Sequence, residues 1–215
     1  MERTKNKANS HEITLYFYPN TRAIRAIWLL EELEIDYQLR LVDLVNDQQN
    51  SENYLMINPL AKVPAMAFDS QVITETLAIC LFLSDKFSQA GLAPSIEDKN
   101  RLDYYRWVAF ASTSLEPAII EKIRDKKAEE QNLASIKMNA LFSPLEQVLA
   151  VLEKQLAENS YFVANKFSTA DLLIAALLIW AKKLQLTKPY PNIESWITKI
   201  TSRKAYQLAL SKQEN

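Results

Sequence analysis

Three residues in the first half of the chain, Thr74, Glu75 and Thr76, could bind a small charged ligand. They follow a short run with strand character, residues 71–73, and they open an apolar helix. Free N–H groups and the helix dipole favour an anion at a helix N-terminus, so the hydroxyl and N–H of Thr76 could bind a carboxylate. Glu75 could bind the ammonium group of the same ligand. The same residues could instead form an ordinary capped helix start, which is the commoner role of such a sequence.

A loop with a proline stands shortly before these residues and leads into another strand. Val63 and Pro64 precede the apolar run of residues 65–68, and the segment of residues 58–87 reads NPLAKVPAMAFDSQVITETLAICLFLSDKF. Loop, strand, turn, strand and helix thus follow one another closely. This order suits the recognition of a small, charged, peptide-like ligand.

The elements that must position this segment begin with a strand and a helix. Residues 13–18 are rich in β-branched and aromatic side chains, which predicts a strand. Residues 38–44 alternate as a second strand does, and residues 46–53 form a polar loop. Between the two strands, apolar residues recur at helical spacing, at Ala23, Ala26, Ile27, Leu30 and Leu33. With the two later strands and the helix of residues 74–87, the order predicts a thioredoxin-like α/β domain.

The second half of the chain reads as helices throughout. The one glycine, a proline and polar residues mark a boundary at residues 89–98. Pro117 should bend or break the first helix beyond it. We expect helices over residues 99–127, 134–157, 169–183 and 193–200 and near Ala205, which together form an all-α helical bundle.

The clearest local signal in this half is a helix cap. Ser168 stands at the N-cap and Asp171 three residues later, the spacing of a capping box with Asp in place of Glu or Gln. Phe167 and Leu172 stand at the hydrophobic-staple positions. Such a cap contributes about 1 kcal/mol, and its role is structural.

Composition argues against several classes of function. A net charge of −1 over 215 residues gives no indication of nucleic acid or an anionic membrane as a partner. The longest apolar run, residues 172–181, is about half as long as a membrane span requires. The polar N-terminus does not read as a signal peptide. One glycine excludes a glycine-rich phosphate loop, and one cysteine fits a reducing cytosol.

Several motifs in this order resemble the cytosolic-type, bacterial-like glutathione S-transferase family. The family pattern NPxGKVPxL, followed by an E-S pair, is similar to NPLAKVPAM and the later Glu75-Thr76. SRxxRxxWLLEEL resembles residues 21–33, and GDxFSxADxxLA resembles ANKFSTADLLIAALLIWA. YPxLxxWxxRxxxRPAxxxAL resembles residues 190–210. The resemblance covers roughly residues 13–210.

The resemblance implies a site for glutathione, γ-Glu-Cys-Gly. The pair at the helix start would grip the γ-glutamyl end. Val63-Pro64 matches the family's cis-proline loop, in which Val63 would pair with the cysteinyl backbone like an added strand. Lys62 could meet the glycine carboxylate or remain a solvated lysine. The glycine of the family's loop is Ala61 here, so we expect a loop without a positive φ.

The glutathione thiol needs activation, because its pKa is about 8.5 and it is therefore only slightly ionised at neutral pH. Thr21 has the place of the family's thiol-binding serine at the start of the first helix, and it is the first catalytic candidate. Tyr16, in the position of the catalytic tyrosine of other transferase classes, is the second; it could instead pack in the core. Asn20 could donate to the sulfur through its amide.

The second substrate should be a small apolar electrophile. Trp107, Phe110 and Ser114 are candidate pocket residues in the helical domain, although an aromatic stripe at this spacing also fits a core. Cys80 should be a small core residue rather than a nucleophile, and His11 has no evident role. No set of His, Cys, Asp and Glu shows metal-ligand spacing, so no metal is expected.

We therefore expect a cytoplasmic glutathione transferase that acts in detoxification, with glutathione as cosubstrate. Its parts would be a tail at residues 1–11, a thioredoxin-like glutathione-binding domain at 12–88 and an all-helical domain at 98–215 that supplies the electrophile pocket. The family implies a homodimer. Two alternatives stay open: a glutathione-dependent peroxidase using the same thiolate, and a non-catalytic transferase-like binding or scaffold protein.

Overall fold

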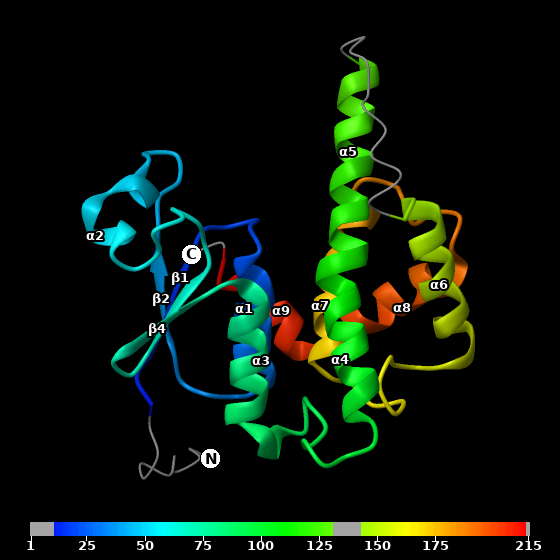
Figure 1. Cartoon of the computed structure of the whole chain (residues 1–215), viewed down its shortest axis with the longest axis horizontal. Helices are drawn as coiled ribbons and strands as arrows, with labels where there is room; N and C mark the ends of the chain where they lie inside the picture. The colour runs from blue at the N-terminus through cyan, green and yellow to red at the C-terminus, as the bar shows by residue number, and fades with distance from the viewer. Residues whose placement is uncertain (1–10, 131–142, 214–215) are drawn as a thin grey trace. The chain divides into compact units, whose positions relative to one another are not determined.

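The structure, a computed structural model, describes residues 11–130 and 143–213 (Figure 1). The chain divides into two compact units. The first unit contains the described residues up to Lys86 together with those from Lys204 onward, and the second unit is Phe87–Arg203.

The first unit is built on a four-stranded sheet in the order β2-β1-β3-β4. β1 (Ile13–Phe17) runs parallel to β2 (Gln38–Leu41) and antiparallel to β3 (Ala65–Phe68). β3 in turn pairs antiparallel with β4 (Gln71–Thr74). β3 has the predicted bounds, β2 is shorter than predicted, and the thioredoxin-like fold class is confirmed.

Helices cover both faces of this sheet (Figure 1). α1 (Ala23–Glu32) and α3 (Thr76–Lys86) pack side by side on one face. The short α2 (Glu52–Leu55) lies on the other face, and its first residues fall within the predicted loop of residues 46–53. All apolar positions predicted for the buried stripe of α1 are buried, and Trp28 and Leu29 are buried as well. α1 is therefore a core helix rather than an amphipathic surface helix.

The last helix differs from its prediction. The sequence placed it with the helical domain, whereas α9 (Lys204–Ser211) packs against α1 in the first unit. The rings of Tyr206 and Trp28 lie 4.7 Å apart, and both side chains are buried. α9 thus completes the core of the first unit.

The second unit is the predicted all-α bundle. It contains α4 (Arg101–Phe110), α5 (Glu116–Glu130), α6 (Leu145–Glu158), α7 (Thr169–Lys183) and α8 (Pro191–Thr201). α7 has the predicted bounds and contacts both α4 and α8. Of the helix predicted over residues 134–157, residues 134–142 lie outside the described residues.

A π-helical turn, Ala111–Leu115, joins α4 to α5. The N–H of Glu116 donates to the carbonyl of Ala111, five residues earlier. Pro117 has no N–H, so it cannot donate to the carbonyl of Thr113 as an α-helix would require. Pro117 was expected to bend or break the helix; the structure instead has a π-helical turn at this place, and such turns are frequent at functional sites.

The capping box at the start of α7 forms as predicted. The Asp171 carboxylate accepts hydrogen bonds from the N–H and the hydroxyl of Ser168, at 2.9 and 2.8 Å. Its other oxygen accepts the N–H of Phe162 at 3.0 Å. Asp171 is fully buried, and burial raises the pKa of its carboxyl to about 6 although these hydrogen bonds favour the ionised form.

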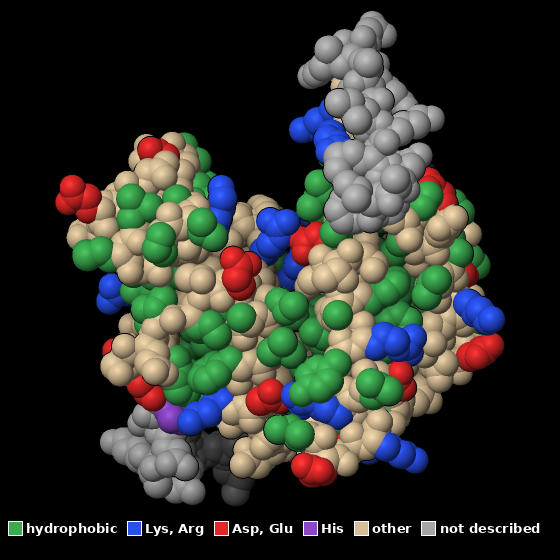
Figure 2. All heavy atoms as spheres, viewed as in Figure 1, with side chains coloured by type: hydrophobic (Ala, Val, Ile, Leu, Met, Phe, Trp, Pro, Cys, Tyr) green, Lys and Arg blue, Asp and Glu red, His purple; other side chains and the backbone are tan. Residues whose placement is uncertain are grey.

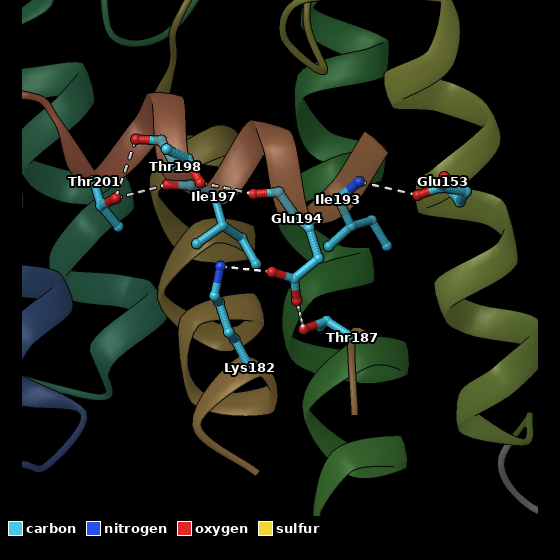
Figure 3. Close-up of polar contacts among 8 residues, drawn as sticks. All are labelled: Glu153, Lys182, Thr187, Ile193, Glu194, Ile197, Thr198 and Thr201. Atoms are coloured by element: carbon cyan, nitrogen blue, oxygen red, sulfur yellow. Dashed lines mark hydrogen bonds and ion pairs between the residues drawn. The ribbon is translucent and has the colours of Figure 1, made fainter. Parts of the chain in front are cut away.

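Charged side chains form hydrogen bonds and an ion pair that connect α8 to α6 and α7 (Figure 3). Glu153 of α6 accepts the main-chain N–H of Ile193 at 2.9 Å, so it satisfies a donor at the open start of α8. Glu194 of α8 pairs with Lys182 of α7 at 2.5 Å and accepts the hydroxyl of Thr187. These contacts fix the start of α8 against its two neighbours.

The surface carries charges of both signs. Figure 2 shows Lys and Arg side chains interspersed with Asp and Glu on the face drawn, in keeping with the net charge of −1. Among the described residues, no helix is long and apolar enough to cross a membrane.

Replacement of Asp171 by alanine should destabilise the protein by about 2–4 kcal/mol at pH 5, because two buried N–H groups and a hydroxyl lose their acceptor. Chemical denaturation measures this change. Asp103→Ala is the control: this exposed carboxylate pairs with Arg106 on the same helix, so its loss should change stability by at most about 0.5 kcal/mol.

The difference in stability between the wild type and Asp171→Ala should depend on pH. A carboxyl whose pKa is raised in the folded state stabilises the protein most below its ordinary pKa of 3.8, and that stabilisation is lost as the pH rises through about 6. The difference should therefore shrink between these values, by at most about 1.4 kcal/mol per pH unit. A difference that is constant or grows with pH would contradict a neutral, buried Asp171.

Candidate functional site

The strand register brings three segments of the chain to one edge of the sheet. Ala65, the first residue of β3, pairs with Tyr16 of β1 on one side and with Thr74 of β4 on the other. Neighbouring strands lie about 4.8 Å apart, so the segments that follow β1, precede β3 and follow β4 leave the sheet at the same edge. These segments contain Thr21, Val63 and Thr76.

Thr21 lies just before α1, as predicted for the thiol-binding hydroxyl. Its hydroxyl donates to the carbonyl of Tyr18 at 2.6 Å and accepts the N–H of Ala23 at 3.3 Å. Thr21 is half-buried, and the neighbouring Asn20 is exposed with a left-handed backbone, φ 58°. The Thr21 hydroxyl is thus oriented by the first turn of the helix and remains partly accessible.

Tyr16 points to the opposite face of the sheet from the core residue Leu15, because side chains alternate along a strand. Its ring meets the edge of Tyr54 of α2, with centroids 5.9 Å apart. The two tyrosines line a pocket of about 190 Å³ together with Arg40 and Ile57, among others. Burial, with Tyr16 nearby, raises the pKa of Tyr54 to about 12. Tyr16 therefore contributes to the packing of α2 and also borders an accessible space.

The loop before β3 is held by two buried side chains. The Val63-Pro64 peptide bond is cis, as the resemblance implies. The Tyr54 hydroxyl and the Asn58 side-chain amide both donate to the carbonyl of Lys62 at 2.7 Å. Both donors are buried, whereas the Lys62 side chain is exposed. The main chain directly before Val63 is therefore fixed in place.

The prediction for Ala61 is wrong. We expected a loop without a positive φ, but Ala61 has φ 53°. Its N–H donates to the carbonyl of Asn58 at 2.9 Å, and the Asn58 side chain accepts the N–H of Leu60 at 3.1 Å. These bonds, with the contact of Asn58 to Lys62, close a turn that requires a left-handed residue at this position whether or not it is glycine.

Glu75 and Thr76 do not form an ordinary cap. An N-cap is usually extended, with a side chain that accepts an N–H of the first turn. Glu75 instead has φ 67° and an exposed side chain, while its carbonyl accepts the N–H of Ile79 at 3.0 Å. Among the described residues, neither Thr74 nor Glu75 provides a side-chain cap. A left-handed backbone of this kind costs about 1–3 kcal/mol, so the surrounding structure must maintain it.

The residues predicted to bind the electrophile lie in the second unit. Trp107 is 1% exposed and packs against Phe110 and Phe162, with ring centroids 5.3 and 4.8 Å apart. It is a core residue, so the prediction that it lines an open pocket is wrong. Phe110 and Ser114 are half-buried; Phe110 directly precedes the π-helical turn, and Ser114 lies within it.

Cys80, the one cysteine, is fully buried in α3, as predicted, and burial raises the pKa of its thiol to about 12. It is therefore no nucleophile near neutral pH. His11, for which the sequence indicated no role, contacts Asp69 at 2.8 Å and packs against Phe68. Within the described part of the chain, His, Cys, Asp and Glu form no group that could hold a metal ion.

Sequence reasoning missed Tyr54 and Asn58, the residues that fix the cis-proline loop. Asn58 opens the motif quoted above, but its type alone does not reveal that it contacts three neighbouring peptide groups. Tyr54 lies in a helix of four residues, which is too short to give a periodic pattern.

Comparison with known proteins matches both units to one family. The model of the glutathione S-transferase N-terminal domain matches residues 11–85, and that of the C-terminal domain matches residues 85–204. Glutathione S-transferase 3 of Schizosaccharomyces pombe is 30% identical over 216 residues, which cover 94% of this chain and 88% of the relative. The chain belongs to the glutathione S-transferase family.

Other proteins are similar to the chain over nearly its whole length. The disulfide-bond oxidoreductase YfcG of Escherichia coli is 27% identical, over 94% of this chain and 96% of its own. A sphingomonad glutathione S-transferase, solved in complex with glutathione, is 25% identical with a TM-score of 0.75, over 94% of this chain and 98% of its own. The Xylella fastidiosa enzyme, 21% identical over 94% of this chain and 99% of its own, has the same fold with a TM-score of 0.79.

Replacement of Ala61 by glycine should leave the free energy of unfolding unchanged or raise it by up to about 1 kcal/mol. Relief of the left-handed strain, about 1–2 kcal/mol, outweighs or balances the added freedom of the unfolded chain, about 0.4–1 kcal/mol. Ala67→Gly, the same change within β3, should lower stability by about 0.5–1 kcal/mol. Equal losses for both variants would contradict a left-handed Ala61 in solution.

Proposed function

We propose that the protein is a glutathione transferase, with glutathione as cosubstrate. Its family membership, the names of its relatives and the glutathione complex of a similar enzyme support this function. The observation that carries it is the register at Ala65, which brings the segments around Thr21, Val63 and Thr76 to one sheet edge.

Each group of glutathione has a proposed partner on this edge. The N–H groups and hydroxyl at Thr76 would bind the γ-glutamyl carboxylate, because a helix N-terminus favours an anion. The exposed Glu75 carboxylate would bind the ammonium group. The main chain of Val63, next to cis-Pro64, would pair with the cysteinyl backbone. Lys62 would meet the glycine carboxylate.

The Thr21 hydroxyl would stabilise the thiolate. A hydrogen bond to a charged group contributes about 1.5–3 kcal/mol, which corresponds to roughly one to two units of thiol pKa. The hydroxyl has one hydrogen, so the bond to sulfur would replace its bond to the Tyr18 carbonyl. The thiol proton passes to solvent, and the thiolate attacks an electrophilic carbon. A sulfur–carbon bond forms, and the leaving group departs with its electron pair.

We assign residues 12–88, with the exposed Asn20 beside Thr21, to glutathione binding. The helical unit up to Arg203 would bind the small apolar electrophile, with Phe110 and Ser114 as pocket residues. A homodimer acting in cytoplasmic detoxification, without nucleic acid or membrane partners, is part of the proposal. It rests on the family resemblance, and a lone buried cysteine is in keeping with a reducing compartment.

Replacement of Glu75 by alanine should weaken glutathione binding at least about tenfold, because the ammonium group loses a charged partner. Calorimetric titration gives the dissociation constants. Glu34→Ala is a matched control, since Glu34 is also exposed and left-handed, with φ 52°, but lies at the far end of α1. Equal affinity of the Glu75 and Glu34 variants for glutathione would contradict the role of Glu75 in binding the ammonium group.

Thr76→Ala should weaken glutathione binding in the same titration, and Thr76→Ser, which keeps the hydroxyl, should not.

Replacement of Thr21 by alanine should lower kcat with an aryl halide by about tenfold to a hundredfold, while Thr21→Ser keeps most of the activity. The Michaelis constant for glutathione should change little, because the lost bond forms mainly with the thiolate. Tyr16→Phe, measured in parallel, should have a small effect. Unchanged turnover in Thr21→Ala together with a large loss in Tyr16→Phe would transfer the catalytic role to Tyr16.

A further inference from the structure

The described residues that follow α9 are anchored against α1. After α9, Lys212 pairs with Glu31 of α1 at 2.5 Å, and its ammonium group lies 4.5 Å from the centre of the Tyr37 ring. Tyr206 of α9 packs on Trp28. The segment that follows α9 therefore has a fixed path along α1 rather than a free one.

Gln213 extends this path to the loop that carries Thr21. Its side-chain oxygen accepts the main-chain N–H of Asn20 at 3.2 Å. Gln213 is only 9% exposed, and its own N–H donates to the carbonyl of Leu210 at 3.1 Å. A buried side chain on an anchored turn holds its acceptor in one place, so the bond to Asn20 is pre-organised.

The peptide group that Gln213 contacts determines the direction of the main chain into Thr21. Asn20 is left-handed, with φ 58°, and this conformation costs an L-residue free energy unless neighbouring contacts maintain it. Because Thr21 is the next residue, a change at Asn20 would rotate the hydroxyl relative to the sheet edge.

We infer that Gln213 is a positioning residue for catalysis, which acts through the N–H of Asn20 on the orientation of the Thr21 hydroxyl. This role rests on the proposed function. Gln213 thereby belongs to the thiol-activating part of the site, although it lies 193 positions after Asn20 in the sequence.

The test compares three variants of the full chain. Gln213→Met removes the acceptor at similar volume, and Gln213→Glu keeps an acceptor oxygen. Gln207→Met makes the same change as the first variant at an exposed position of α9 and serves as the control. Hydrogen exchange of the Asn20 amide reports the hydrogen bond without glutathione. The thiol pKa of bound glutathione and the separate values of kcat and KM report catalysis.

In Gln213→Met the Asn20 amide should exchange about threefold to tenfold faster, as expected for loss of one hydrogen bond. kcat should fall by a similar factor, the bound thiol pKa should rise, and KM for glutathione should stay within about twofold. Gln213→Glu should restore slow exchange, and Gln207→Met should match the wild type.

Unchanged exchange, thiol pKa and kcat in Gln213→Met would overturn the inference and leave the proposed function intact. Faster exchange with unchanged thiol pKa and kcat would also overturn it, because the contact would then be only structural. A wild-type protein that does not lower the thiol pKa of glutathione would contradict the proposed function, and the catalytic role of Gln213 with it.

Discussion

The pairing of Ala65 with both Tyr16 and Thr74 is the constraint on which the site depends. It makes one strand end the meeting point of three segments that are far apart in sequence. A shift of one residue would move every side chain of β3 to the other face of the sheet. Met66 and Phe68, which are large, are buried on one face, and the small Ala65 is buried on the other, so such a shift is disfavoured and hydrophobic packing fixes the geometry of the polar edge.

A near absence of glycine sets a second constraint. Where main-chain geometry demands a left-handed residue, this chain uses other residue types, at Asn20, Glu34, Ala61 and Glu75 among others. Each of these needs support from its surroundings. Buried side chains provide it at two places next to the site, where Asn58 closes the turn at Ala61 and Gln213 binds the peptide N–H of Asn20. The conformation of these loops is therefore stabilised by tertiary contacts rather than by the conformational freedom of glycine.

Sequence predicted the elements whose patterns are local. β3, α7 and the capping box at Ser168 follow from strand character, apolar continuity and residue spacing. The positive φ of Ala61, the burial of Trp107 and the docking of α9 did not follow, because each is set by contacts with residues distant in sequence or by a turn closed by side chains. The resemblance supplied the roles proposed for Thr21, Val63 and Thr76, and the register explains why these residues share one edge.

The most direct measurement is a nuclear magnetic resonance titration of the protein with glutathione, followed on the main-chain amides. If the register forms one glutathione site, the amides of Thr21, Val63 and Thr76 will shift together and yield a single dissociation constant, while those at the opposite sheet edge, near Asp69, stay in place. Shifts that cluster elsewhere, or different constants for the three segments, would contradict a single site at this edge.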